Sequence, residues 1–389
     1  MSAVKNLSLI DPPFLIGLSV VTLTVFVASW SRPRQGWLRW TFRGLGVVLP
    51  ILMAASAVNA RYAYFPTVAA VFGRDAIDQI SPAQLHQLEF AAGSRTSGLG
   101  RSLGARLALA GSSGDLHLDH GVVAPFTIPA TVSRFRARTA LVYLPPAYFA
   151  TPRPQLPVIE LLHGTPGSPA DWTRAGFADL TADAYASQHD GYAPILVMPD
   201  VNGGWTSDSE CVNGTRGQVQ TYLTVDVRDA IIARFHTRAD AAGWAIAGFS
   251  EGAYCALQIG LRHPDLYGAI GDFSGEEGPS VPGGLQRLFA GTVQQAEQQA
   301  ALYNPAVLLK HWNDPVRPPI WFEVGTDDIT AHAMTSLDRL ALADGFDTRF
   351  VVQQGADHGF ASWRDALRDS LPWFAHMMAV PASPLTNSA

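Results

Sequence analysis

The sequence has few cysteines, no cluster of metal ligands and no internal repeat. Its 389 residues include only two cysteines, Cys211 and Cys255, so at most one disulfide can form within the chain. His117 and His120 lie close together, but no further ligand set accompanies them. We therefore expect no metal site, and no pattern indicates a cofactor.

The chain also lacks the excess of positive charge that nucleic-acid binding requires. Its net charge is −6. Up to Asp115 it has 10 Lys and Arg against 5 Asp and Glu, whereas the remainder has 17 against 28. An acidic domain binds a phosphate backbone poorly, so nucleic acid is disfavoured as a partner. With 48% apolar residues, the chain can bury a substantial core, and its length predicts one large domain and a smaller part.

Two apolar runs near the N-terminus lack charge altogether. Phe14 to Trp30 and Gly44 to Ala60 are 17 residues each, near the lower limit for crossing a bilayer core of about 30 Å. A pair of buried core helices is the alternative. We favour membrane spans, because the runs have no charged face and precede any sheet pattern. The sequence therefore predicts the membrane bilayer as a partner.

The loop between the two runs predicts their orientation. It is rich in arginine, whereas only Lys5 precedes the first run. The positive-inside rule places such a loop in the cytoplasm, so the N-terminus and everything after Ala60 lie outside the plasma (inner) membrane. A signal peptide cleaved near Ala55-Ser56-Ala57 is the alternative, but this site lies behind a complete first span. The arginines are Arg32, Arg34, Arg39 and Arg43.

The rest of the chain has the pattern of an α/β protein. We divide the whole into a two-span transmembrane anchor (1–65), an interfacial segment and linker (66–117), and an outer α/β domain (118–389). In the outer domain, short apolar strands alternate with helical stretches, which predicts a mostly parallel sheet with helices on both faces and an active site at the carboxyl ends of the strands. The predicted strands are Val122–Ile128, Ser133–Tyr143, Val158–Leu162, Ile195–Met198, Trp244–Ala247, Ala269–Phe273, Ile320–Val324 and Thr348–Val352.

One strand end is followed by a nucleophile pattern. The apolar run Trp244–Ala247 leads into Gly248-Phe249-Ser250-Glu251-Gly252 and then into a helical run. This is the strand, sharp turn and helix of a nucleophile elbow, which holds a serine at a helix N-terminus. A second G-x-S-x-G match, at residues 100–104, has no apolar strand before it. We therefore predict Ser250 as the nucleophile.

Two other strand ends supply groups that can act with Ser250. His358 directly follows the last predicted strand, and Asp327 and Asp328 follow the strand before it. The order Ser, acid, His is the chain order of the α/β-hydrolase triad. His358 is the expected base, and one of the two adjacent aspartates is expected to hold its tautomer.

A third strand end predicts an oxyanion hole. The turn His163-Gly164-Thr165-Pro166-Gly167 follows Val158–Leu162 and can aim a backbone N–H at the serine. We expect the N–H groups of Thr165 and Glu251 to be the two donors. A Gly-Pro turn without a catalytic role is the alternative.

The two cysteines connect the same region. Cys211 lies in the loop after a central strand, and Cys255 lies in the helix behind the nucleophile. An even pair in an exported domain indicates a disulfide. Two buried free thiols are the alternative, because the sequence does not give the distance between the Cα atoms.

Six motifs resemble those of one family, in the same order: LLHGTPG, DSECVNG, GFSEGAYCAL, LRHP, GTDD and GADHGFASW. They resemble the putative-esterase family of α/β hydrolases, which includes esterase D, bacterial feruloyl esterases and the secreted mycolyltransferases. The resemblance covers about His120 to Met378, and the preceding spans resemble those of membrane-anchored actinobacterial members. It implies a serine esterase with Ser250 and His358 in its triad. The acid of the esterase members is the fourth residue of a G-T-x-D turn, here Asp328; mycolyltransferases have a glutamate, which this turn lacks.

The chain departs from the family at Glu251, where many members have Met, His or Gln. An ionised carboxylate beside an oxyanion hole opposes the transition-state charge unless it points away or meets a cation. One expectation is that Glu251 binds the ammonium group of a cationic ester substrate, such as an aminoacylated lipid. The alternative is that it points away and forms a structural hydrogen bond or ion pair.

Three functions remain after these observations. The leading one is a carboxylic-ester hydrolase at the outer membrane face, acting through an acyl-enzyme on an ester such as a lipid. An acyltransferase would use the same residues and pass the acyl group to an alcohol. A non-catalytic anchored scaffold agrees less well with a complete Ser, Asp and His set. The sequence gives neither the acyl and alcohol parts of the substrate nor the oligomeric state, but we expect residues 207–222 and 275–299 to line the pocket.

Overall fold

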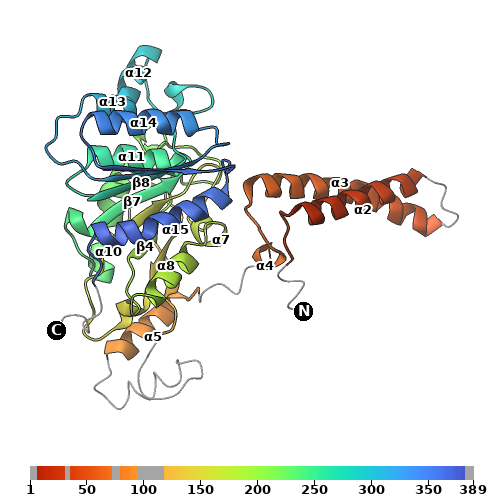
Figure 1. Ribbon diagram of the computed structural model, residues 1–389, viewed down its shortest axis with the longest axis horizontal. Coiled ribbons are helices and arrows are strands. Elements are labelled where there is room, and N and C mark those ends of the chain that lie inside the picture. Colours follow the sequence, from red (N-terminus) through yellow and green to blue (C-terminus); the bar gives the residue numbers. More distant parts are fainter. Residues whose placement is uncertain (1–6, 31–35, 72–78, 94–117, 382–389) are drawn as a thin grey trace. The chain divides into compact units, whose positions relative to one another are not determined.

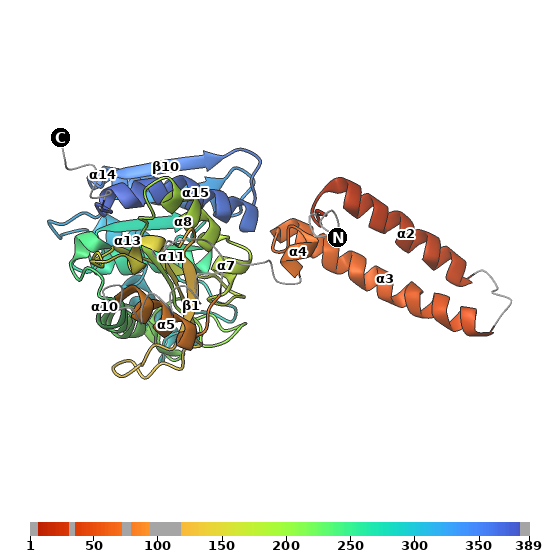
Figure 2. The ribbon, with the colours of Figure 1, turned by 90° about the horizontal axis from the view of Figure 1, so that it is seen from below.

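The computed structural model describes residues 7–30, 36–71, 79–93 and 118–381, which form two compact units. The first unit is helical. Its helices α2 (Pro12–Trp30) and α3 (Gly36–Tyr62) pack side by side, and the short helix α4 (Val68–Val71) follows them (Figure 2). Backbone hydrogen bonds from Leu9 N to Pro66 O (2.9 Å) and from Val68 N to Leu7 O (3.1 Å) join the two ends of this unit.

The helices α2 and α3 are long and apolar enough to cross a membrane, by length and composition. Many of their apolar side chains are exposed among the described residues, and Ile16, Leu23 and Ile51 are each more than 60% exposed. In water such exposure is unfavourable, whereas in lipid it costs nothing. The connecting residues 31–35, with Arg32 and Arg34, lie outside the described residues.

The second unit contains an eight-stranded sheet in the order β1-β2-β4-β3-β7-β8-β9-β10 (Figure 1). Strand β2 pairs antiparallel with both β1 and β4, and all other neighbours pair parallel. This confirms the expected α/β-hydrolase type of fold with a mostly parallel sheet. The strands are β1 (Val122–Phe126), β2 (Ala140–Leu144), β3 (Val158–Leu162), β4 (Ile195–Met198), β7 (Trp244–Phe249), β8 (Ala269–Phe273), β9 (Ile320–Gly325) and β10 (Thr348–Gln353).

Helices cover both faces of this sheet, so its central strands are buried on both sides (Figure 1). One face carries α11 (Glu251–Arg262), α13 (Pro305–Lys310) and α14 (Ala331–Ala343), and the other carries α8 (Ala178–Ser187) and α15 (Phe360–Met377). The remaining elements are α7 (Asp171–Arg174), α9 (Val219–Thr221), a π-helical turn (Tyr222–Val227), α10 (Arg228–Phe235), α12 (Val293–Ala301), the two-residue strands β5 (Asn213–Gly214) and β6 (Gly217–Gln218), and three 3₁₀ turns (Pro146–Phe149, Ala241–Gly243 and Leu285–Arg287).

The strand predicted over Ser133–Tyr143 is wrong in its first half. Strand β2 begins at Ala140, because hydrogen bonds to side chains hold the preceding backbone. The N–H groups of Val132 and Ser133 donate to the carboxylate of Asp226 (both 2.9 Å), and Arg138 N donates to Asp200. Backbone groups satisfied in this way are not available for a strand ladder.

Part of the predicted interfacial segment belongs to the α/β unit. Residues 79–93 of that stretch belong to the second unit, where α5 (Pro82–Gly93) buries Leu85 and Leu88 in the core. Glu89 of this helix accepts hydrogen bonds from Arg234 (2.8 and 2.9 Å) and from the hydroxyl of Tyr148 (2.6 Å). Residues 94–117, with the second G-x-S-x-G match and His117, lie outside the described residues.

Candidate active site

Ser250 lies in a sharp turn between β7 and α11. Its backbone has φ 55° and ψ −127°, a conformation that a non-glycine residue adopts only where the surroundings enforce it. The flanking glycines permit this turn: a Cβ on Gly248 would lie 2.1 Å from Gly252 O, and one on Gly252 would lie 2.3 Å from Leu162 O. The sequence pattern thus predicted the local geometry of a nucleophile elbow.

The side chain of Ser250 lies next to that of His358. Ser250 Oγ is 2.9 Å from His358 Nε2, and Nδ1 of the same ring is 3.0 and 3.1 Å from the two carboxylate oxygens of Asp328. A carboxylate facing Nδ1 holds the proton on that nitrogen, so Nε2 is free to accept the serine proton. The loops after β7, β9 and β10 therefore bring together three side chains that lie far apart in the sequence.

Asp328, rather than Asp327, faces the histidine. Asp328 is buried, and its Oδ1 also accepts hydrogen bonds from the backbone N–H and the hydroxyl of Thr330, both at 2.8 Å. Burial opposes ionisation of Asp328, but the hydrogen bonds from His358 and Thr330 outweigh it and lower its pKa. Asp327 is exposed, and its carboxylate accepts a hydrogen bond from the neighbouring Thr326 (3.2 Å).

Aromatic packing fixes the plane of the histidine ring. The rings of Trp363 and His358 meet edge to face at a centroid distance of 5.1 Å and an angle of 90°. Trp363 in turn stacks on Phe249, the residue before Ser250, at 4.5 Å. A ring held in this way loses little further freedom when it accepts a proton.

The expected oxyanion donors lie on the two segments that flank Ser250. Glu251 is the first residue of α11, so its N–H is one of the unpaired donors at a helix N-terminus. Thr165 follows Gly164, whose position touches the serine: a Cβ there would lie 3.1 Å from Ser250 Cβ. Within the described part of the chain, neither N–H has an acceptor. Both are therefore available to a bound oxygen.

The carboxyl group of Glu251 is not presented to substrate, contrary to one of the two expectations from the sequence. The residue is only 7% exposed. Its Oε2 contacts the hydroxyl of Thr165 and accepts a hydrogen bond from Asn202 Nδ2 (2.8 Å), while Oε1 accepts one from Glu210 N (3.1 Å). These internal partners occupy both oxygens, so the contacts agree with the structural role for Glu251 and not with an ammonium-binding one.

Cys211 and Cys255 form a disulfide, with their Cα atoms 5.6 Å apart. Cys211 lies in the loop after β4, and Cys255 lies in α11, one turn beyond the nucleophile. The bond therefore holds the loop that contains Glu210 against the helix that begins at Glu251.

The sequence reasoning missed the residues that follow β4. Asn202 donates to both Thr165 Oγ1 (2.6 Å) and Glu251, and Asp200 accepts from Arg138 Nη2 (2.6 Å) while lying 3.2 Å from His163 Nε2. Both lie at the carboxyl end of a central parallel strand. The same strand-end rule that identified Thr165, Asp328 and His358 would have identified them.

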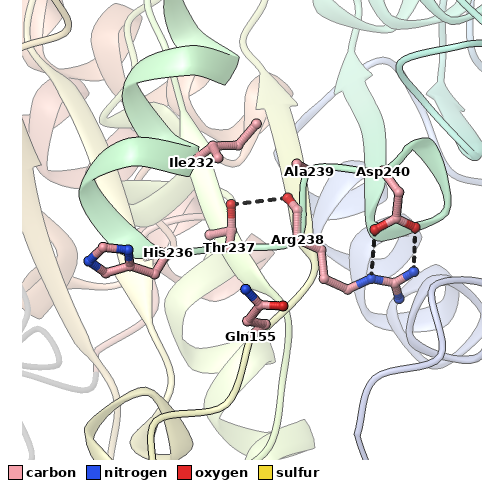
Figure 3. A pocket seen from close by; sticks show the side chains of 7 residues that line it. All are labelled: Gln155, Ile232, His236, Thr237, Arg238, Ala239 and Asp240. Carbon is pink, nitrogen blue, oxygen red and sulfur yellow. Dashed lines mark hydrogen bonds and ion pairs between the residues drawn. The ribbon is translucent and has the colours of Figure 1, made fainter.

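A hollow of about 540 Å³ lies at the opposite edge of the sheet, ahead of β3 and β7 (Figure 3). Three of its polar residues pair with one another: Arg238 binds the Asp240 carboxylate through Nε (3.1 Å) and Nη2 (2.5 Å), and Thr237 donates to Arg238 O (Figure 3). It contains no pair of nucleophile and base, so it does not compete with the Ser250 site. Its lining residues are Gln155, Ile232, His236, Thr237, Arg238, Ala239 and Asp240.

Comparison with known proteins identifies the family of the chain. The family model described as "Putative esterase" matches residues 134–374, more than half of the chain. An uncharacterised protein of Corynebacterium glutamicum is 37% identical over 260 residues, which are 64% of this chain and 59% of that protein. An esterase of Mycobacterium tuberculosis is 32% identical over 234 residues, 59% of this chain and 45% of that protein. The chain thus spans about half the length of these curated relatives.

Among solved structures, a ferulic acid esterase matches 66% of this chain and 98% of its own, with a TM-score of 0.57 at 19% identity. At that identity the likeness concerns the fold alone. The family match covers the elbow, the two strand-end loops that carry Asp328 and His358, and both cysteines. The chain therefore belongs to the putative-esterase family of α/β hydrolases.

Proposed function

We propose that this protein is a serine carboxylic-ester hydrolase, anchored in the plasma membrane by α2 and α3, with its α/β unit outside the cell. The observation that carries the proposal is the hydrogen-bonded chain from Ser250 Oγ through His358 to Asp328, located at the N-terminus of α11. Ser250, His358 and Asp328 are the proposed catalytic residues. The anchor is supported by the length and composition of the two helices.

Acylation follows from this arrangement. His358 Nε2 accepts the proton of Ser250 as its oxygen attacks the ester carbonyl, and Asp328 stabilises the imidazolium that forms. The N–H groups of Glu251 and Thr165 are the proposed donors to the tetrahedral oxyanion. The intermediate collapses when His358 returns the proton to the alcohol oxygen, which leaves an acyl group on Ser250.

Deacylation repeats these steps with water. His358 takes a proton from the water as it attacks the acyl carbonyl, and the carboxylic acid departs when Ser250 regains its proton. An alcohol in place of water would make the protein an acyltransferase with the same residues. A scaffold without activity would not need the alignment of Ser250, His358 and Asp328.

A lipid ester is the substrate class that the anchor supports, because a tethered site meets substrates in or near the bilayer. The cationic acyl group considered for Glu251 has no such support, since both carboxyl oxygens have internal partners. We therefore propose an uncharged or anionic ester over an aminoacylated one.

The test uses the full-length protein purified in detergent. We expect hydrolysis of p-nitrophenyl esters and of phospholipid esters, with release of free fatty acid, and none with Ser250→Ala. A chromatographic analysis of products with added alcohol separates the two reactions: a new ester as the main product makes the protein a transferase. Absence of both products with every ester would leave only the scaffold.

The orientation is tested separately in intact cells. A single cysteine introduced at Gln35 should resist a membrane-impermeant maleimide, whereas one at Gly98 should react. The native cysteines are joined to each other and give no background. The reverse pattern would refute the outward orientation without affecting the proposed chemistry.

A further inference from the structure

The carboxyl group of Glu251 occupies an electrostatically unfavourable position. It belongs to the residue whose N–H faces the proposed oxyanion hole, and it is buried. A negative charge there would oppose the negative charge that develops on the substrate oxygen. Its hydrogen-bond partners show how this conflict is avoided.

The number of hydrogens around Thr165 decides the protonation state. Thr165 Oγ1 lies 3.0 Å from Ser207 O and also in hydrogen-bond contact with Glu251 Oε2. The hydroxyl has one hydrogen, so it can donate to only one of these two oxygens. Ser207 O is a carbonyl and cannot donate. Both contacts are hydrogen bonds only when Glu251 carries a proton and donates it to Thr165.

Asn202 does not supply the hydrogen that is missing between Thr165 and Glu251. Its Oδ1 accepts a hydrogen bond from Ser209 N (2.7 Å), which fixes the orientation of the amide. Its Nδ2 therefore faces Thr165 Oγ1 (2.6 Å) and Glu251 Oε2 (2.8 Å) and is a donor to both. A neutral Glu251 supplies the hydrogen that the contact between Thr165 and Glu251 needs.

Asp208 adds a further acidic group beside Glu251. Its negative charge disfavours a second negative charge on the buried Glu251 carboxyl group.

We propose that Glu251 is a positioning residue that acts in its neutral form, joining the Thr165 turn and the loop after β4 to the N-terminus of α11 so that the two oxyanion donors stay aligned. The inference rests on the proposed esterase function and deepens it. It assigns a role to the position at which this chain departs from its family.

The surroundings of Glu251 favour the neutral form. Burial, followed by the negative charge of Asp208, raises the pKa of Glu251 to about 8. Glu210 and Glu276 add acidic groups to the same cluster, and burial raises the pKa of each. The charged or titratable groups around the cluster are Asp208, Glu210, Arg216, Tyr254, Glu276 and His358.

Ionisation of Glu251 should therefore inactivate the enzyme. The ionised form has no hydrogen for Thr165, so the hydroxyl must leave Ser207 O to satisfy the carboxylate, and the Thr165 turn loses a contact. The new charge also opposes the oxyanion. Both effects act on the transition state more than on substrate binding, so kcat should fall while KM changes little.

The experiment is a pH profile of kcat and KM between pH 6 and pH 10 for the full-length protein in detergent. We expect kcat of the wild type to fall about tenfold per pH unit above about pH 8. Glu251→Gln cannot ionise, so its profile should stay flat over the alkaline range at a lower maximum. Asp265→Asn is the matched control, because it removes an exposed acid from the turn after α11, away from the expected pocket, and it should keep the alkaline fall.

A second variant tests the coupling and does not depend on the folding of the first. Asp208→Asn removes the negative charge that raises the pKa of Glu251, so the alkaline fall should move to lower pH. Circular dichroism across the range excludes unfolding as the cause. The role of Glu251 is overturned if kcat of the wild type does not fall at alkaline pH. It is also overturned if the fall stays unchanged in both Glu251→Gln and Asp208→Asn. Either result leaves the esterase function intact. Absence of ester hydrolysis at every pH would instead contradict the proposed function.

Discussion

The two sides of Ser250 have buried carboxyl groups that behave in opposite ways. On one side, Asp328 faces His358, and the hydrogen bonds it receives lower its pKa despite burial. On the other, Glu251 faces Asp208 and Thr165, and burial raises its pKa to about 8. Burial alone therefore does not decide whether a carboxyl group is ionised. The neighbouring groups that donate hydrogen bonds to it or carry charge beside it decide its ionisation.

This difference matches the chemistry expected on each side. In the proposed mechanism the histidine side stabilises a cation, the imidazolium, and an ionised aspartate suits that role. The oxyanion side must stabilise an anion, and a neutral Glu251 leaves the N–H groups unopposed. The following predictions test each side in turn.

The largest effect is expected on the histidine side. Ser250→Ala and His358→Ala should each lower kcat by about 10³-fold or more, because the members of a triad act as a unit. Ester hydrolysis under saturating substrate provides the measurement. The double variant should be little worse than either single one, and additive losses would show that the two residues do not act together.

The two adjacent aspartates provide a matched pair for the next effect. Asp328→Asn should lower kcat by about 10²- to 10⁴-fold, because an amide favours the wrong tautomer of His358. Asp327→Asn should change kcat less than about twofold, since Asp327 is exposed and its carboxylate accepts a hydrogen bond from the neighbouring Thr326 rather than from His358. The reverse ranking would assign the acid to Asp327.

Much of the histidine side could be predicted from the sequence because each of its residues directly follows an apolar strand. In a parallel sheet the carboxyl ends of the strands meet at one edge, so Ser250, Asp328 and His358 converge wherever the strands do. The choice of Asp328 over Asp327 could not be made from the pattern alone, because adjacent residues point in different directions. The family's G-T-x-D turn predicted Asp328, which is the aspartate that faces His358 in the structure.

The oxyanion side was less predictable because loops build it. The direction of the Glu251 side chain depends on Asn202 and Glu210, which belong to an irregular loop with no periodic pattern. The packing of helix α5 into the second unit was unpredictable for a different reason. Its sequence has a weak amphipathic pattern, and its place in the structure depends on tertiary contacts such as that between Glu89 and Arg234.

The disulfide on the oxyanion side should have an intermediate effect. It joins residues 44 apart in sequence, and the double variant Cys211→Ser, Cys255→Ser should lower the free energy of unfolding by about 2–4 kcal/mol. The freed loop carries Asn202 and Glu210, so kcat should also fall, by about threefold to tenfold. Chemical denaturation of the α/β unit within the full-length protein measures the free energy of unfolding, and an ester assay measures kcat. Native protein with two alkylatable thiols would contradict the bond itself.

The smallest effect concerns the stability of the folded state between pH 6 and pH 7. Glu251 has a folded pKa of about 8 against 4.5 for an ordinary glutamate, so the native state keeps a proton that the unfolded state has lost. Its stabilising contribution is complete below about pH 4.5 and declines as the pH rises through about 8, at up to about 1.4 kcal/mol per pH unit. Glu160 and Asp272, with pKa values raised by burial to about 8 and about 7, add the same dependence in every variant.

The comparison between wild type and Glu251→Gln isolates the contribution of Glu251. Denaturation at pH 6 and at pH 7 should show that the wild type loses about 1 kcal/mol more than the variant over this step, because glutamine has no proton to lose. Asp327→Asn, an exposed change, should follow the wild type. Equal losses in the wild type and in Glu251→Gln would mean that Glu251 is already ionised at pH 6. In that case the oxyanion side would hold a charge as the histidine side does, and the contrast between the two sides would not exist.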